Sequence, residues 1–198
     1  MKNAFLFPGQ GAQFAGMGRD LYESSKSVQD LFVLASDVSG KDAAALVFDS
    51  DDEALKATDV AQLAITLVNL SAATVLGEKG VLCHGTAGFS LGEYASLVQS
   101  GVLSTTDAIR LIGIRGQLME KASRALDSPG GNPGMAAVVG MDPDGVATAI
   151  QNIDGVYVAN LNSPVQTVIS GTHAGLAEAE SLLKEAGVRR FIRLKVSG

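Results

Sequence analysis

The stretch Gly88-Phe89-Ser90-Leu91-Gly92-Glu93 decides how the sequence is interpreted. It places a serine in the pattern G-x-S-x-G, after the apolar run 81–83 and before a segment, 91–99, that is predicted to be helical. Flanking glycines permit the tight strand-to-helix turn that exposes a serine hydroxyl. Free N–H groups at the start of the helix, that of Leu91 among them, can then face a developing oxyanion. We therefore interpret Ser90 as a candidate nucleophile; a plain glycine-rich turn is the alternative.

Working outward, the first half of the chain alternates strands with helices. The apolar run 4–7 stops at Pro8-Gly9-Gln10-Gly11, as a buried parallel strand does where it opens onto a loop. The run 81–83 is predicted to start a second buried strand. Helices are predicted from a Ser27 cap to about 38, over 59–76 and 91–99, and from a cap at 104–106 to about 126. This order predicts an α/β fold with a parallel sheet covered by helices on both faces.

The composition changes at 128–134, Ser-Pro-Gly-Gly-Asn-Pro-Gly, which we interpret as a linker or sharp connection. Beyond it the predicted order is strand 135–140, helix 143–152, strands 156–160 and 166–170, helix 172–186 and strand 190–196. This is the β-α-β-β-α-β order of a ferredoxin-like unit. We expect a large subdomain at 1–128 and a small one at 129–198.

Composition excludes several classes of protein. With 46% hydrophobic residues the chain can bury a core, and its net charge of −6 argues against a general nucleic-acid binder. The single cysteine, Cys83, excludes a disulfide framework and favours a reducing, cytoplasmic location. The most apolar segment, 60–76, carries polar residues, and no membrane span is expected.

Two histidines are available to activate a serine, and neither is a convincing base. His84 lies six residues before Ser90 in an extended segment, which puts the two up to about 20 Å apart. His173 is predicted to start a helix in the second half of the chain, where a surface position is the simpler interpretation. A nucleophile without an evident base is a gap in the pattern.

Arg115 is the second candidate residue, because helical spacing puts its guanidinium on an apolar face. A charge there needs an anionic partner. That partner is either a side chain such as Asp107 or Glu93, or the carboxylate of a substrate held by a bidentate clamp. The spacing alone favours neither. Its neighbours three and four residues away are Leu111, Ile112, Leu118 and Met119.

Gln10 is the third candidate residue. It follows the first predicted strand, as Ser90 follows the second, and the carboxyl ends of parallel strands line the ligand crevice of an α/β sheet. The backbone N–H of Gln10 could therefore be a second oxyanion donor, and a plain turn residue is the alternative.

Basic residues gather near the end of the chain. The segment 184–198 holds five of them against one acid, Glu185. Solvated surface is one interpretation, and a docking face for an acidic partner is the other. The basic residues are Lys184, Arg189, Arg190, Arg193 and Lys195.

Four motifs resemble, in order and spacing, those of the malonyl-CoA:acyl carrier protein transacylases, the acyltransferases of fatty-acid and polyketide synthesis. The resemblance covers the whole chain and corresponds to the N-terminal two-thirds of the family's chain. The motifs are Phe7-Pro8-Gly9-Gln10-Gly11-Ala12-Gln13 with Gly16-Met17-Gly18, Gly88–Tyr94, Arg115-Gly116-Gln117-Leu118-Met119, and Asn160-Leu161-Asn162-Ser163-Pro164-Val165-Gln166-Thr167-Val168-Ile169-Ser170-Gly171.

The resemblance implies malonyl transfer from CoA to a carrier-protein thiol, with Ser90 carrying the malonyl ester. It implies that Arg115 pairs the malonyl carboxylate and that the N–H groups of Gln10 and Leu91 form the oxyanion hole. It implies no cofactor, since malonyl-CoA is the substrate, no metal, and neither nucleic acid nor membrane as partner. It implies a hydrolase-like subdomain, incomplete in this chain, with a ferredoxin-like small subdomain. We further expect Gln10, Asn160 and Asn162 to bind substrate, and Arg189 and Arg190 to bind the carrier protein.

The chain departs from the family pattern in two places. Phe89 stands where family members usually have histidine, which removes polar support for Ser90 from its neighbour. The family's catalytic histidine lies a few residues beyond the stretch matching 193–198, so the chain as given is expected to be a fragment that is inactive by itself. The alternatives are a serine hydrolase of the esterase type and a non-catalytic truncated homologue that acts as a binding module.

Overall fold

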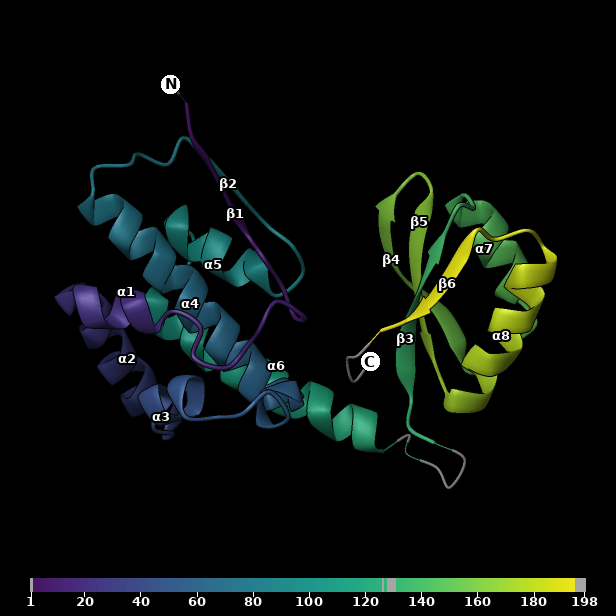
Figure 1. The fold of residues 1–198 in the computed structure, drawn as a ribbon, viewed down its shortest axis with the longest axis horizontal. Coiled ribbons are helices and arrows are strands. Elements are labelled where there is room, and N and C mark those ends of the chain that lie inside the picture. Colours follow the sequence, from purple (N-terminus) through teal and green to yellow (C-terminus); the bar gives the residue numbers. More distant parts are fainter. Residues whose placement is uncertain (1, 126, 128–130, 195–198) are drawn as a thin grey trace. The chain divides into compact units, whose positions relative to one another are not determined.

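The computed structural model describes residues 2–125, 127 and 131–194, which divide into two compact units, Met1–Leu118 and Met119–Gly198 (Figure 1). The division falls inside helix α6 (Thr105–Arg124), ten residues before the boundary expected at 128/129. Residues 128–130, the first part of the expected linker, lie outside the described residues. Each unit has its own cluster of buried apolar side chains.

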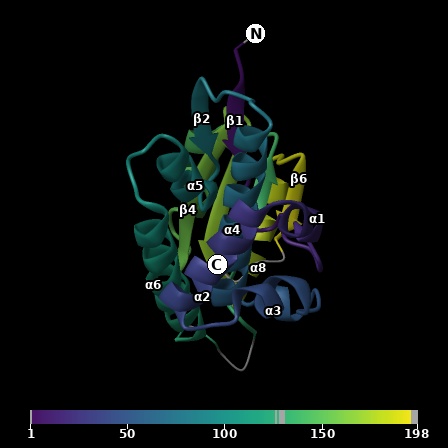
Figure 2. The ribbon, with the colours of Figure 1, turned by 90° about the vertical axis from the view of Figure 1, so that its left-hand side faces the viewer.

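The first unit contains a parallel pair of strands, β1 (Ala4–Phe7) and β2 (Gly85–Gly88), with Phe7 opposite Gly88. Phe5 and Phe7 are buried, whereas Leu6 between them is 75% exposed. Helix α5 (Gly92–Gln99) packs on both strands (Figure 2). The predicted covering of both faces is therefore not found in the described residues: the pair buries the face that carries Phe5 and Phe7 and exposes the other.

The second strand begins later than predicted. The run 81–83 is outside any element, and β2 is the sequence Gly-Thr-Ala-Gly at 85–88. The Asn3 side chain donates to the Leu82 carbonyl (3.1 Å), and the His84 N–H donates to the Asn3 carbonyl (2.9 Å), so this segment pairs with the chain before β1. Three of the four residues of β2 have low strand propensity, and at the last of them, Gly88, the start of α5 approaches the backbone closely.

Serine side chains begin two of the helices of this unit. The Ser25 hydroxyl accepts from the Val28 N–H (3.2 Å), so the cap of α2 is Ser25 rather than the predicted Ser27. Ser104 accepts from the Asp107 N–H (3.0 Å) and begins α6, as the sequence indicates. The two short helices α1 and α3 were not predicted. The remaining bounds are α1 Arg19–Ser24, α2 Lys26–Ser39, α3 Ala43–Phe48, the 3₁₀ turn η1 Ala54–Lys56 and α4 Thr58–Glu78.

Helix α4 is the central helix of the first unit. It contacts α1, α2, α3, η1 and α5, and twelve of its residues are buried. By length and composition alone it could cross a membrane, but 61% of its most apolar window is buried inside the protein. This burial is what the core helix of a globular unit requires.

The second unit has the element order β-α-β-β-α-β that the sequence predicts. Its four strands form one antiparallel sheet in the order β4-β5-β3-β6, with α7 and α8 on one face (Figure 1). The predicted end of the last strand, 195–196, lies outside the described residues. The bounds are β3 Gly134–Val139, α7 Pro143–Ile150, β4 Val156–Ser163, β5 Gln166–Gly171, α8 His173–Glu185 and β6 Arg190–Arg193.

Candidate active site

Ser90 occupies the sharp corner between β2 and α5. Its φ of 49° is the one positive value at a non-glycine residue in the described part of the chain, and its side chain is exposed. The Gly92 N–H donates to the Phe89 carbonyl (2.9 Å), and the Glu93 N–H donates to the Ser90 carbonyl (3.0 Å), which starts the helix directly after the serine. A non-glycine residue in this backbone region is strained, and such strain is characteristic of functional turns.

The two glycines of the G-x-S-x-G pattern are required by close backbone approach. A Cβ on Gly88 would lie 2.1 Å from the Gly92 carbonyl carbon, and one on Gly92 would lie 2.1 Å from the Phe7 carbonyl oxygen. Any side chain at either position would push α5 away from the strands. Backbone contacts therefore require glycine at both positions of the motif in this chain. A glycine-rich turn that arose by chance would show no such requirement.

The loop that carries Gln10 lies beside the Ser90 turn. The Phe89 N–H donates to the Phe7 carbonyl (2.9 Å), and a Cβ on Gly9 would lie 2.4 Å from the Phe89 carbonyl oxygen. The backbone N–H groups of Gln10 and Leu91 make no hydrogen bond with any described residue. Two unused donors thus lie on the two segments that meet at Ser90, as an oxyanion site requires.

Arg115 lies on α6 with its guanidinium against α5. Its Cζ is 5.9 Å from the centre of the Tyr94 ring, and Tyr94 follows Ser90 by one helical turn. The Nη1 atom is buried and makes no hydrogen bond with a described residue. Asp107, one of the two carboxylates considered as its partner, instead pairs with Arg110 (2.9 Å). Among the described residues, the Arg115 guanidinium therefore keeps an unused buried donor.

The two histidines belong to different units, and the one in the unit of Ser90, His84, is not beside it. His84 precedes β2, whereas Ser90 follows it, so the whole strand separates them. The His84 Nδ1 atom accepts from the Asn3 N–H (3.1 Å). One ring nitrogen is therefore used at the amino-terminal end of the strand pair, whereas Ser90 is at the carboxyl end. His173 begins α8 in the second unit and borders Gly131, where a Cβ would lie 2.6 Å from its Nδ1 atom.

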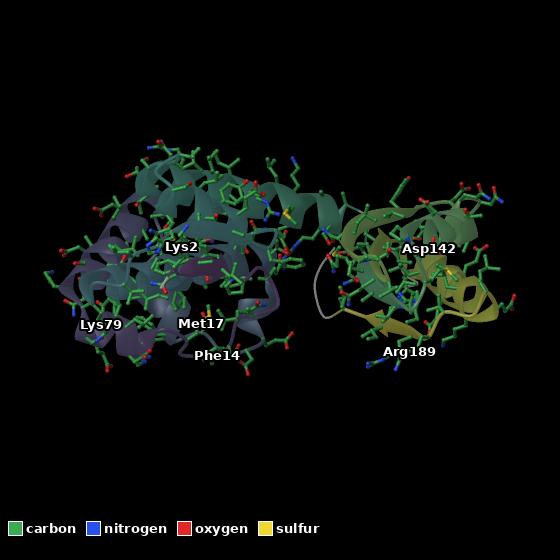
Figure 3. The ribbon with its side chains drawn as sticks, turned by 90° about the horizontal axis from the view of Figure 1, so that it is seen from above. Lys2, Phe14, Met17, Lys79, Asp142 and Arg189 are labelled. Carbon is green, nitrogen blue, oxygen red and sulfur yellow. The ribbon has the colours of Figure 1, made fainter. Side chains whose placement is uncertain are left out.

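The other predicted site residues belong to the second unit. Asn160 and Asn162 lie on β4, with a register irregularity in its pairing with β5 between Val158 and Asn160. Arg189 and Arg190 are exposed at the start of β6, and Figure 3 shows the Arg189 side chain directed away from the ribbon. These four residues stay predictions as site residues.

Two side chains near the Ser90 turn had no role in the sequence interpretation. Tyr94 was quoted as part of the motif 88–94 without a role, and in the structure its ring contacts the Arg115 guanidinium. Asn69 is 6% exposed on α4, and its Nδ2 atom donates to the Pro8 carbonyl (3.0 Å). The signal for Asn69 was present, since a polar side chain in an apolar buried helix needs a partner.

The fold and this turn define an α/β protein with an exposed G-x-S-x-G serine at a strand–helix corner. The chain belongs to the family of acyl transferase domains, whose sequence model matches residues 4–196. It is 41% identical over its whole length to the malonyl CoA-acyl carrier protein transacylase of Bacillus subtilis (strain 168), of which it covers 62%.

Solved structures agree with this assignment. The crystal structure of MCAT from Streptococcus pneumoniae is 40% identical, with a TM-score of 0.87, and the chain covers 64% of it. The complex PlMCAT:AntF, a type II PKS acyl-carrier protein with its malonyl-transacylase, contains a chain that is 37% identical, with a TM-score of 0.87 and 63% covered. Both likenesses span all of this chain. The chain thus has a little under two thirds of the length of the relatives it matches.

Proposed function

We propose that the protein is a malonyl-CoA:acyl carrier protein transacylase of fatty-acid biosynthesis, in which Ser90 carries the malonyl group as an ester. The observation that carries this proposal is the unused buried guanidinium donor of Arg115 beside the helix that begins at Ser90. An enzyme for neutral acyl esters gains nothing from a buried cation next to its nucleophile. A malonyl group presents a carboxylate that would pair with it.

In the proposed reaction the Ser90 Oγ attacks the thioester carbonyl of malonyl-CoA. The oxyanion that forms is held by the N–H groups of Gln10 and Leu91. The carbon–sulfur bond breaks, and CoA leaves as a thiol with the proton that Ser90 gave up. The thiol of the carrier protein then attacks the ester carbonyl, and the bond between the malonyl carbon and the Ser90 Oγ breaks. The proton of the thiol is returned to Ser90, and malonyl remains on the carrier protein as a thioester. Neither described histidine is assigned as the base.

The second unit has two roles in this proposal. Asn160 and Asn162 bind the substrate. For the Gln10 side chain of the first unit we propose substrate binding separately, since its Nε2 atom is a buried donor without a partner among the described residues. Arg189 and Arg190 meet the acidic carrier protein. We interpret the first unit as part of a hydrolase-like subdomain and the second as a ferredoxin-like small subdomain. A cytoplasmic location fits the single, free cysteine.

The experiment that tests the proposal is mass spectrometry after incubation with malonyl-CoA, with Ser90→Ala as control. It uses a protein that contains residues 1–198 together with the histidine that the family pattern places beyond them. We expect a stable malonyl adduct that peptide mapping places on Ser90 and that the variant lacks. Release of free malonate without a lasting adduct would instead indicate a serine hydrolase. No adduct and no malonate would indicate a non-catalytic binding module.

A further inference from the structure

We infer that Asn69 is a positioning residue that holds the Pro8–Gln10 loop, and with it the Gln10 N–H, in the geometry for oxyanion binding. This inference rests on the proposed function for its catalytic part. Its structural part concerns one hydrogen bond between α4 and the loop that follows β1, two segments that are 61 residues apart in sequence.

An amide side chain buried at position 69 is costly unless it has a hydrogen-bond partner. Asn69 is 6% exposed, and its neighbours one turn away on α4, Ile65 and Ala73, are buried apolar residues. An amide buried on such a face loses its hydration and needs a partner inside the protein. An aliphatic side chain of the same size would fit this apolar helix without that cost. The Pro8 carbonyl, 3.0 Å from the Asn69 Nδ2 atom, is the partner that explains the amide.

The loop needs an anchor at this point because of its own composition. Pro8 has no N–H, and the next residue is Gly9, whose φ and ψ are the least restricted of any residue type. Fixing the Pro8 carbonyl sets the plane of the Pro8–Gly9 peptide and limits the orientations open to the Gly9–Gln10 peptide. On the far side, the Gly11 N–H donates to the Gln13 Oε1 atom (2.8 Å). The Ala12 N–H also donates to the Gly9 carbonyl, in a long hydrogen bond of 3.4 Å. Gln10 therefore lies between two side-chain anchors and beside one long backbone hydrogen bond, with its own N–H left unused.

For such a donor, the correct position matters almost as much as its presence. Removing one oxyanion donor costs roughly a hundredfold to a thousandfold in rate, and a displacement of about 1 Å can cost a hundredfold. The donor acts on the transition state, so its displacement lowers the rate constant for loading Ser90. It leaves the concentration of malonyl-CoA that gives half the maximal rate nearly unchanged.

The test compares Asn69→Leu, which removes the amide at similar volume, and Asn69→Asp, which replaces the donor by an acceptor. The matched control is Ser71→Ala on the same helix. Ser71 is 1% exposed, and its hydroxyl donates to the Leu67 carbonyl (2.7 Å), so the control removes a buried hydrogen bond that does not reach the loop.

The first readout is hydrogen–deuterium exchange of the segment 7–11, which needs no catalytic activity. Both Asn69 variants should exchange faster there than the wild type, and Ser71→Ala should not. The second readout is single-turnover loading of Ser90 over a range of malonyl-CoA concentrations. The loading rate constant should fall about 10- to 100-fold in both Asn69 variants, with half-saturation changed by less than about twofold.

Unchanged exchange in the Asn69 variants would overturn the inference at its first step. Faster exchange with an unchanged loading rate would overturn the oxyanion role. An equal loss of rate in Ser71→Ala would show that α4 stability, not loop position, is responsible. If the wild type itself is never loaded, the proposed function fails, and the exchange data still decide whether Asn69 holds the loop.

Discussion

At the scale of single residues, Ser90 and Arg115 share one property. Each is placed in an arrangement that is unfavourable for the folded protein alone: Ser90 has a positive φ, and Arg115 has a buried donor without a partner among the described residues. Both are next to the first turn of α5: Ser90 forms the turn that precedes this helix, and Arg115, on α6, contacts Tyr94 within it. A carboxylate on a ligand would pair with the Arg115 donor, and the strained turn keeps the Ser90 hydroxyl exposed to a carbonyl of the same ligand.

Replacing Arg115 by alanine should affect loading of two acyl groups unequally when only one of them has a carboxylate. We expect Arg115→Ala to reduce loading of Ser90 from malonyl-CoA far more than loading from acetyl-CoA. The loss of discrimination should be about 2–5 kcal/mol, because a charge-assisted pair in a partly buried site disappears. Loading rates with the two donors measure it. Equal losses for both acyl groups would remove the clamp role from Arg115.

The sequence was informative about these residues because their chemistry conflicts with their surroundings. A guanidinium on an apolar helix face and a serine between glycines can be recognised from spacing alone. The partner of Arg115 could not be chosen in this way, since sequence spacing does not show whether Asp107, Glu93 or a ligand carboxylate reaches the guanidinium. Only the structure shows that Asp107 pairs with Arg110.

At the scale of elements, α4 and α6 are in contact through a glycine. A Cβ on Gly116 would lie 2.9 Å from the Asp59 Cα atom at the start of α4, whereas one on Gly113 would meet no atom within 4 Å. The two glycines are on the same helix, three residues apart. Close packing is therefore needed at Gly116 and not at Gly113.

This contrast gives a matched pair of stability predictions. Gly113→Ala should stabilise the protein by about 0.5–1 kcal/mol, because alanine loses less backbone freedom in a helix. Gly116→Ala should destabilise it by about 1–3 kcal/mol, because α4 or α6 must move to accept the methyl group. Urea unfolding of both variants beside the wild type measures the difference. Stabilisation by both alanines would contradict the contact between α4 and α6.

Element boundaries followed from the sequence where local chemistry dominates and failed where packing does. The helix starting at Ser104 and the strands and helices of the second unit begin within two residues of the predicted positions. Strand β2 was misplaced because Gly85–Gly88 has almost no strand propensity; its conformation comes from pairing with β1 and from the close approach of α5. Helices α1 and α3, at six residues each, are too short for a periodic pattern to be recognised.

At the scale of the whole molecule, charge governs the proposed encounter with a carrier protein. The chain has a net charge of −6, so a strongly acidic partner is repelled at long range and needs a local basic surface. Arg193 and Lys184 lie near Glu180 (3.8 and 2.7 Å), which offsets part of their charge. Arg189 and Arg190 are exposed and form no ion pair with a described residue. Among the described basic residues of the segment 184–194, they are the two without an ion pair.

Charge reversal at both positions, Arg189→Glu with Arg190→Glu, should slow malonyl transfer to the carrier protein and flatten its salt dependence. Loading of Ser90 from malonyl-CoA should change little. The double variant Lys2→Glu with Lys79→Glu is the control, because it changes the net charge by the same amount. Lys2 precedes β1 and Lys79 follows α4, whereas Ser90 follows the carboxyl end of β2. Transfer rates at low and high salt measure the effect. Unaffected transfer at low salt would make the two arginines ordinary solvated surface.

The central claim is that one malonyl group passes through Ser90 to the carrier protein. It is tested most directly with a protein that contains residues 1–198 together with the histidine that the family pattern places beyond them. This protein is loaded with isotopically labelled malonyl-CoA, free CoA esters are removed, and holo-carrier protein is added. We expect the label to leave Ser90 and appear on the carrier thiol in equal amount, with no transfer by Ser90→Ala. Release of the label as free malonate at the same rate with or without carrier protein would contradict the account, as would transfer by Ser90→Ala.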